Sequence, residues 1–539
     1  MVAIFFLTYP PSKPPQRDAA TPQVTTQPIN TSKLDGKVVK LETTKNQAPA
    51  AEALLKLKTE LKTLSNEVLE LKINSLGEVL NVQFLKYSKE PNSEEKVSRS
   101  FSEANNFNLS SVFVESEEVQ WKSAILTDET LELLGQTGSF QIVRRMSLES
   151  GTYFLRVVDQ IKNEGASSAD AKVKVRLAEG IDPAKQSSFL ERIFKPQANF
   201  QKVVWLQKDS LDYKMFEEVA SHKLESPETF QWAGFADKYF LYAFVPLNTS
   251  LVDVELTRVA LKIEERFTTS TKQIPPGDTA SLEYAFYLGP KKISDLEKLT
   301  PSLTRSIEYG NWIGPISRVL LSILLFFESL FKNFGVAIIL LTLVVKTLLF
   351  PLAYKAAVSM RKLSLLQPKM LEVREKYKKD PQRMNVEMMS LYKTEKVNPV
   401  GGCLPMLVQM PVFFALYRVF FASIEMRHSP FIAWIQDLAH YDHFFVLPVA
   451  MTALMVYQQR ITPMPDSGQD SEAMRIQKVM LKWMPPFFGA IMLFLPAGLT
   501  LYFLVNSALS IAQQLFINKK LDKILPRPAS NSLQVVNGN

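Results

Sequence analysis

A lysine in the middle of a long apolar run constrains the fold more than any other feature of the sequence. The run extends from Phe334 to Leu352, and Lys346 is the only charged residue within it. About nineteen residues of α-helix cover roughly 28 Å, close to the hydrocarbon thickness of a bilayer. A charge inside such a span costs a few kcal/mol and usually faces a bundle interior or a water-filled cavity. The run therefore predicts a functional position inside a membrane, with snorkelling of the lysine to an interface as the alternative.

The 539-residue chain has two unlike halves. Up to about Lys292 apolar and polar residues alternate, whereas after Trp312 long apolar runs dominate. Alternation in segments such as Leu69–Asn74 and Lys172–Leu177, separated by short polar turns, predicts an N-terminal antiparallel β-sandwich domain with one solvated face per sheet. This half contains no nucleophile elbow and no Gly-rich phosphate loop. We therefore predict that the chain is not an enzyme.

The N-terminal segments are interpreted by length and composition. Residues 1–9 are too few to cross a bilayer and lack the basic segment of a signal peptide, so we interpret them as the remnant of a first transmembrane helix. Residues 10–51, rich in Pro, Thr, Gln and Ala, are predicted to be a flexible linker. The β domain is predicted over 52–300, with a short helix at 54–64 before its first strand.

The second half is predicted to be an α-helical polytopic membrane domain. Residues 301–332 are expected to form amphipathic helices in the interface, because charges interrupt the apolar run near both ends. The core is expected at 333–520 and the tail at 521–539. The five membrane spans of the core are predicted at about 334–353, 403–423, 442–459, 483–496 and 498–517.

A basic helical hairpin is predicted between the first two of these spans, over 355–398. Asp380 is suited to cap its second helix, with Pro381 at the first helical position, and the apolar spacing favours an antiparallel coiled coil. Cations gather in this hairpin and at the C-terminal end of the chain, which indicates that both lie in the cytoplasm, with the β domain on the other side. No RNA-binding motif accompanies the cations, so we predict no sequence-specific nucleic-acid partner.

The sequence offers little for metals or cofactors. Cys403 is the only cysteine, so an intrachain disulfide is impossible. His440 and His443 lie beside Asp442, but no third ligand has suitable spacing, and a polar interfacial loop is the preferred interpretation. There is no Walker or other nucleotide-binding loop. We therefore expect neither a metal site nor a cofactor.

Several segments of the second half closely resemble the YidC/Oxa/Alb family of membrane insertases. They are Gln382–Met389, Leu391–Lys393, Val397–Phe413, Arg427–Leu438 and Pro496–Tyr502. The β domain resembles the large periplasmic domain of the Gram-negative members, a β-supersandwich. The resemblance implies a bacterial inner-membrane protein that inserts and folds nascent membrane proteins, alone or with the Sec translocon, without nucleotide hydrolysis.

The resemblance also implies a hydrophilic groove, enclosed by the five spans, open to the cytoplasm and to lipid and closed toward the periplasm. The family keeps an arginine in this groove, and Lys346 stands at the matching position. Lysine keeps the charge but lacks the bidentate fork of arginine. An aromatic pair of the family on the last span is matched by Tyr502 and Phe503.

The predicted groove residues are the polar and apolar side chains that the spans offer near Lys346: Lys346, Thr342, Gln409, Met410, Tyr502, Phe503, Asn506 and Gln513. For Gln409, Asn506 and Gln513, hydrogen bonding between helices is an equal alternative. The methionines at 406, 410, 480, 484 and 492 are suited to an adaptable apolar slide, although ordinary packing explains any one of them.

The cations at the hairpin tip are predicted to contact ribosomes, the targeting receptor or anionic lipids: Lys376, Lys378, Lys379 and Arg383. The alternative is that these cations are solvated, bind no partner, and only reflect the excess of Lys and Arg in cytoplasmic loops. Two other functions stay open. One is a secondary transporter or channel that uses Lys346 as an ion site, and the other is a membrane-anchored domain that processes carbohydrate.

Overall fold

The computed structural model describes most of the chain, and the predictions for residues 1–9 and 10–51 lie outside the described part. The described residues are 61–74, 77–91, 93–100, 111–114, 117–126, 130–180, 201–208, 210–216, 219, 222–224, 229–259, 262–310, 312–395, 397–398, 404–461 and 472–525.

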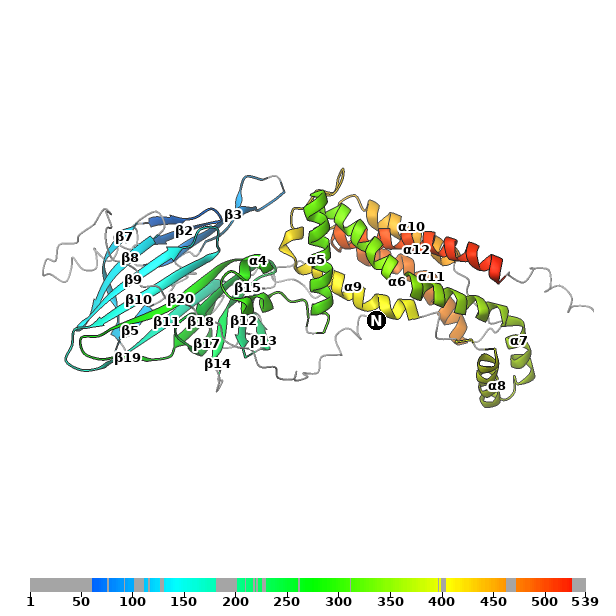
Figure 1. Ribbon diagram of the computed structural model, residues 1–539, viewed down its shortest axis with the longest axis horizontal. Helices are drawn as coiled ribbons and strands as arrows, with labels where there is room; N and C mark the ends of the chain where they lie inside the picture. Colours follow the sequence, from blue (N-terminus) through cyan, green and yellow to red (C-terminus); the bar gives the residue numbers. More distant parts are fainter. Residues whose placement is uncertain are drawn as a thin grey trace, which may run out of the picture. The chain divides into compact units, whose positions relative to one another are not determined.

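The first half forms two antiparallel sheets (Figure 1). The strands are β1 (Leu61–Ser65), β2 (Leu69–Asn74), β3 (Val79–Ser88), β4 (Lys96–Ser100), β5 (Ser111–Val114), β6 (Glu117–Glu118), β7 (Gln120–Leu126), β8 (Thr130–Thr137), β9 (Phe140–Leu148), β10 (Phe154–Asn163), β11 (Ala169–Gly180), β12 (Lys202–Gln207), β13 (Ser210–Met215), β14 (His222–Leu224), β15 (Phe230–Ala236), β16 (Phe240–Pro246), β17 (Leu251–Val259), β18 (Lys262–Thr269), β19 (Lys272–Ile274) and β20 (Thr279–Pro290). The first four strands make one sheet, and the larger sheet follows the path β6-β5-β11-β18-β17-β15-β16-β20-β10-β9-β8-β7.

The predicted β-sandwich is confirmed, and the alternation in the sequence matches the burial. Leu69, Leu71 and Ile73 on β2 are buried while Lys72 is exposed. The predicted helix at 54–64 is wrong over its described residues, because Leu61–Ser65 forms β1 and pairs with β2. Its Lys/Glu background favours a helix locally, but pairing with a neighbouring strand overrides such weak preferences.

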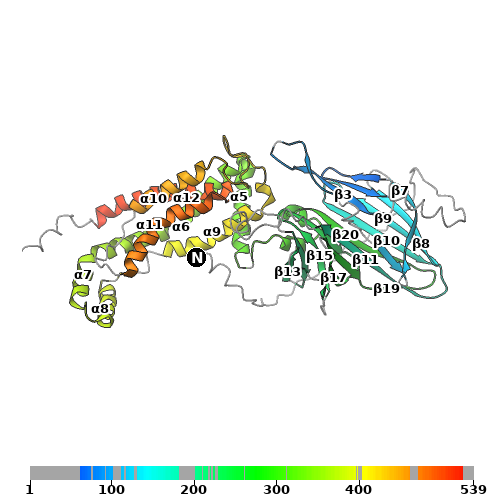
Figure 2. The ribbon, with the colours of Figure 1, turned by 180° about the vertical axis from the view of Figure 1, so that it is seen from behind.

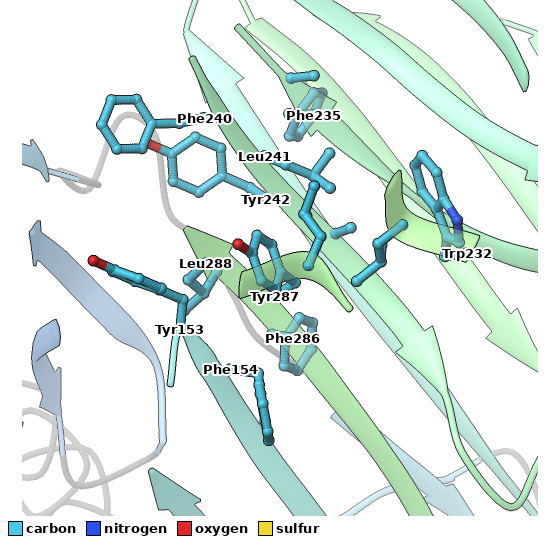
Figure 3. Close-up of a cluster of buried hydrophobic side chains, with 14 of the residues drawn as sticks. Tyr153, Phe154, Trp232, Phe235, Phe240, Leu241, Tyr242, Phe286, Tyr287 and Leu288 are labelled. Atoms are coloured by element: carbon cyan, nitrogen blue, oxygen red, sulfur yellow. The ribbon is translucent and has the colours of Figure 1, made fainter. Parts of the chain in front are cut away.

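Aromatic side chains from β10, β15, β16 and β20 fill the centre of this domain (Figure 3). Nearby, a buried polar triad ties three strands together. Arg144 donates two hydrogen bonds to the Asp159 carboxylate, at 2.7 and 3.0 Å, and the Tyr284 hydroxyl donates a third at 2.8 Å. The carboxylate is thus fully paired, which is the condition under which a buried charge is tolerated.

Glu265 on β18 is also a buried acid, but its surroundings differ from those of Asp159. Its side chain is on the core face of β18, and its cross-strand neighbours are Leu177 and Leu256, which are fully buried. Among the described residues, neither carboxyl oxygen of Glu265 has a hydrogen-bond partner. Burial therefore raises the pKa of the Glu265 carboxyl well above its ordinary value.

The second half is helical. Its elements are α4 (Ile293–Leu296), η4 (Pro301–Ser306), α5 (Gly314–Phe331), α6 (Phe334–Leu365), α7 (Gln367–Lys376), α8 (Pro381–Thr394), α9 (Leu404–Ala422), η6 (Ile424–Met426), α10 (Val446–Ile461), α11 (Glu472–Met492) and α12 (Ala497–Ile524). Within the described residues three of these helices, α5, α6 and α12, are long and apolar enough to cross a membrane. Length and composition do not separate a span from an interfacial helix for α5, so its interfacial placement stays a prediction.

Three helices extend beyond the predicted spans. α6 continues through Pro351 to Leu365, α11 begins at Glu472 rather than 483, and α12 ends at Ile524 inside the predicted tail. Proline is tolerated inside membrane helices because neighbouring helices and local adjustment satisfy the freed backbone groups. Each of these helices therefore continues without a break beyond the predicted membrane span.

The predicted hairpin is formed by α7 and α8. Leu366, Met370 and Met388 are buried between the two helices, and Val373, Met384 and Leu391 pack against them. The Asp380 side chain accepts a hydrogen bond from the Arg383 amide at 3.0 Å, which confirms the cap.

A loop, residues 423–445, covers the end of the bundle opposite the hairpin. We call this end the loop end and the other the hairpin end. Asn333 caps α6 and also donates to the Phe431 carbonyl oxygen at 3.0 Å. A Cβ added at Gly335 would lie 1.8 Å from the Phe431 ring, so only glycine allows this approach. The start of α12 is fixed by the same loop, because the Ala497 amide donates to the His440 carbonyl oxygen at 2.6 Å.

We predict that Glu265 makes the stability of the protein fall as the pH rises. The pKa of the Glu265 carboxyl is higher in the folded state than in the unfolded state, where it is about 4.5. Its contribution to the free energy of unfolding is therefore complete below about pH 4.5 and is lost as the pH rises toward the folded-state pKa. The loss is about 1.4 kcal/mol for each pH unit in this window. Thermal unfolding of wild type and Glu265→Gln between pH 5 and 8 measures it, with the exposed Glu297→Gln as control. Equal slopes for all three proteins contradict the prediction.

Candidate functional site

Helices α6 and α12 lie side by side (Figure 2), and the Lys346 side chain on α6 contacts Ser510 on α12. Its Nζ donates a hydrogen bond to Ser510 Oγ at 2.6 Å, and Ser510 Oγ donates in turn to the Asn506 carbonyl oxygen at 2.7 Å. Lys346 and Ser510 lie twelve and thirteen residues from the loop-end starts of their helices, about 18 to 20 Å deep. No described carboxylate forms an ion pair with Lys346, which is half-buried. The site therefore holds an unneutralised cation at mid-span.

A polar stripe on α12 continues from this contact. Tyr502, Asn506, Ser510 and Gln513 are spaced by four, four and three residues, which places them on one helix face. Asn506 Oδ1 and Gln513 Nε2 are enclosed, and neither has a partner in the described structure. An enclosed polar group without a partner costs about 1–3 kcal/mol. Water or a polar ligand reaching this face would remove that cost.

Toward the loop end the stripe is covered by aromatic and amide contacts. Gln409 Nε2 on α9 donates to Tyr502 Oη at 2.6 Å, and Tyr502 is buried. For Gln409, hydrogen bonding between helices is thus observed. The Phe503 ring lies 5.2 Å from that of Phe413 on α9 and 5.1 Å from that of Phe488 on α11. Three helices are therefore joined here by apolar and neutral contacts.

The other predicted groove residues have different surroundings. Thr342 is buried, and its Oγ1 donates to the Ile338 carbonyl oxygen of its own helix at 2.6 Å, so its hydroxyl is enclosed in packing. Met410 is half-buried on α9. Of the other predicted methionines, Met480 and Met484 are exposed, Met492 is buried, and the Met406 side chain lies outside the described residues.

Ser510 is the residue that sequence reasoning missed. Serine is common in membrane helices, where its hydroxyl bonds to its own backbone, so it drew no notice by itself. The signal was its position four residues after Asn506 and three before Gln513, on the same polar face.

Helix α11 carries one of the runs of exposed apolar side chains in the bundle. Val479, Met480, Trp483, Met484 and Phe487 are all exposed, over about two turns. α11 packs mainly against α10, and a Cβ added at Gly489 would lie 2.0 Å from Thr452 Oγ1. One side of α11 is thus fitted closely to α10, while the other presents large apolar side chains.

The hairpin tip and the loop end carry the remaining candidates. Lys376, Lys378, Lys379 and Arg383 are all exposed at the tip, and the guanidinium of Arg383 lies 5.5 Å from the Tyr377 ring centroid. In the loop, the Asp442 carboxylate accepts hydrogen bonds from Trp434 Nε1 at 3.0 Å and from the Leu447 amide at 2.8 Å. Its carboxylate thus serves the loop and the start of α10, and no metal-binding group of three ligands occurs among the described residues.

Comparisons with known proteins cover nearly all of the described chain. Residues 62–323 match the family model of the YidC periplasmic domain, and residues 326–524 match that of the 60Kd inner membrane protein. A membrane protein insertase YidC of Geobacter metallireducens is 39% identical over 376 residues, covering 70% of this chain and 67% of that protein. The chain belongs to the YidC family.

Other family members agree. The Cellvibrio japonicus membrane protein insertase YidC is 34% identical over 426 residues, covering 77% of this chain and 73% of its own length. That of Geotalea daltonii is 42% identical over 291 residues, and the match spans 53% of its length. A crystal structure described as an active YidC insertase with its first transmembrane domain resolved covers 86% of this chain and 97% of its own, at 17% identity and a TM-score of 0.36.

We predict that the Gln409–Tyr502 hydrogen bond stabilises the bundle by about 1 kcal/mol. Tyr502→Phe removes the acceptor and leaves the Gln409 amide with one partner fewer, while the ring still fills its site. Unfolding in detergent should show a loss for Tyr502→Phe and for Gln409→Leu, and a double variant that loses less than the sum. Strictly additive losses would show that the two side chains are not coupled.

Proposed function

We propose that this chain is a membrane protein insertase and chaperone that passes nascent inner-membrane proteins along a hydrophilic groove beside Lys346. One observation carries the proposal: within the described residues, a cation inside the span without an acidic partner lies next to a polar stripe on which Asn506 Oδ1 and Gln513 Nε2 have no partners. The insertase names of the family relatives support the same role.

The physical task is to move a polar flank of a substrate past about 30 Å of hydrocarbon. A polar face that reaches mid-span shortens that path by about half. The residues assigned to the groove are those with half-buried side chains around the α6–α12 contact: Lys346, Gln409, Met410, Phe503, Asn506, Ser510 and Gln513. Lys346 attracts an acidic segment, and the attraction is strong because little water screens it.

The groove is assigned an opening at the hairpin end and a closure at the loop end. The Phe413–Phe503–Phe488 contacts and the buried Tyr502 support the closure. We place the hairpin and the C-terminus in the cytoplasm and the β domain in the periplasm, as the distribution of cations favours. Insertion in this scheme needs no nucleotide.

Lysine suits the role of a point charge. Within the described part of the chain, Lys346 makes a single hydrogen bond, to Ser510, and no bidentate contact, so its ammonium keeps donors for a carboxylate. An arginine in its place would supply the same charge with a wider fork. Attraction of acidic substrate segments therefore depends on charge rather than on lysine itself.

The partners assigned to this function are nascent membrane proteins and the lipid bilayer, with the Sec translocon as a further partner. The exposed cations of the hairpin tip are assigned to the ribosome and the targeting receptor. A secondary transporter or channel with Lys346 as ion site is the competing function. Ion flux through proteoliposomes in the absence of any substrate protein would favour that function instead.

Neutralising Lys346 is predicted to slow insertion of a single-span protein with an acidic translocated tail by roughly tenfold. Lys346→Arg should retain insertion, because it keeps the charge. Proteoliposomes containing wild type, Lys346→Ala or Lys346→Arg measure protection of the tail from added protease. Lys355→Ala, which removes an exposed lysine of the same helix, is the matched control.

A substrate with a neutral tail separates charge attraction from general damage. It should insert equally well with wild type and Lys346→Ala. Equal insertion of the acidic tail by all variants would exclude the electrostatic role of Lys346, and equal insertion by empty liposomes would exclude the insertase function itself.

Replacing the four tip cations by alanine is predicted to reduce co-sedimentation with ribosomes that are translating a membrane protein, by several-fold at low salt. The control variant loses four exposed lysines elsewhere around the hairpin: Lys355, Lys362, Lys369 and Lys393. If both variants bind equally weakly, the effect is one of net charge and the tip is not a docking site.

A further inference from the structure

A cavity lies between α6 and α12 on the hairpin side of Lys346. Its volume is about 230 Å³, and it is lined by Phe350, Pro351, Tyr354, Phe516 and Lys520. The rings of Phe350 and Phe516 lie 6.3 Å apart. Lys520 Nζ lies 5.1 Å from the centroid of the Tyr354 ring. The cavity is thus an apolar slot with one cation beside it.

The slot lies at a defined depth. Tyr354 is twenty residues beyond Phe334, and Lys520 is twenty-three beyond Ala497, so both lie about 30 to 35 Å from the loop-end starts of their helices. The hydrocarbon core of a bilayer ends near this distance. Tyrosine and lysine are side chains typical of the headgroup level. The mouth of the slot is therefore at an interface and its apolar part faces the acyl chains.

The charge around the slot is positive. The last turns of α12 contain Lys519, Lys520 and Lys523 and a single acid, Asp522. Asp522 forms an ion pair with Arg361 of α6, which is 7% exposed. Lys520 instead lines the slot, with its ammonium over the Tyr354 ring, and its side chain is exposed. Phe516 is 61% exposed, so its ring is available to a ligand from outside the bundle.

We propose that this slot binds one anionic phospholipid of the leaflet at the hairpin end. Its phosphate contacts Lys520, and the first part of an acyl chain lies against Phe350, Pro351 and Phe516. The lining is mainly aromatic and apolar, which favours a lipid over a free phosphate. A volume of about 230 Å³ admits part of an acyl chain but not a substrate helix, whose diameter is about 10 Å. This site is separate from the proposed insertion function and does not depend on it.

Native mass spectrometry of the full-length protein in detergent tests the proposal. The probes are dioleoyl phosphatidylglycerol and dioleoyl phosphatidylcholine, with glycerol 1-phosphate as a soluble competitor. We expect wild type to bind the anionic lipid about fivefold more tightly than the zwitterionic one. Lys520→Ala should remove this preference, while Lys520→Arg and the neighbouring Lys523→Ala keep it. Phe516→Ala should weaken binding of both lipids, and glycerol 1-phosphate should displace neither.

Three outcomes overturn the proposal. Equal loss of preference in Lys520→Ala and Lys523→Ala means diffuse surface attraction rather than a site. Full displacement by glycerol 1-phosphate means that the acyl chain is not held. A photo-crosslinker at position 516 that captures an inserting protein instead of lipid means that the slot belongs to the substrate path. Because Lys520→Arg keeps the positive charge on a long side chain, its binding separates loss of the charge from loss of the fold.

Discussion

The hydrogen bond from Lys346 to Ser510 is the contact around which the helical half is organised. A cation costs about 2.5–3.5 kcal/mol at the centre of a membrane span, and no described carboxylate offsets this. The cost is lowered only if polar groups gather around the ammonium. α12 supplies them on one face, from Tyr502 to Gln513, and α6 therefore packs along that face. The arrangement still leaves Asn506 Oδ1 and Gln513 Nε2 without partners among the described residues, which is a poor solution for a passive anchor and a suitable one for the proposed surface that meets polar substrate segments.

In the β domain, the cost of burying a carboxylate has two different outcomes, at Asp159 and at Glu265. Asp159 is surrounded by Arg144 and Tyr284 and stays paired in the core. Glu265 has apolar neighbours and no partner, so its neutral form is favoured. The two acids are equally buried, and their difference lies in the donors that neighbouring strands bring to them. Composition alone cannot distinguish them, because that difference depends on strand register.

Much of the fold could be predicted from patterns that a single segment contains. Alternation in β2 and the Asp380–Pro381 cap are local, and the structure agrees with both. Prediction failed where a distant partner decides the outcome. Leu61–Ser65 is a strand because β2 lies beside it. Likewise, Ser510 was missed because its contact with Lys346 depends on how α6 and α12 are rotated, which neither sequence segment shows by itself.

The contacts between helices also indicate where a substrate could leave an insertase of this shape. α6 and α12 are joined at three levels, by Lys346 and Ser510, by Tyr354 and Lys520, and by Arg361 and Asp522. Separating them would leave a buried guanidinium and a mid-span ammonium without partners, at a cost of several kcal/mol. α9 and α11, in contrast, each contact Phe503 of α12 through an aromatic ring, Phe413 on α9 and Phe488 on α11. A substrate's apolar side chains can replace such contacts almost without loss, because dispersion forces do not depend on which apolar group supplies them. For the proposed insertase, this difference favours lateral exit between α9 and α11, and Trp483 and Phe487 on α11 are exposed.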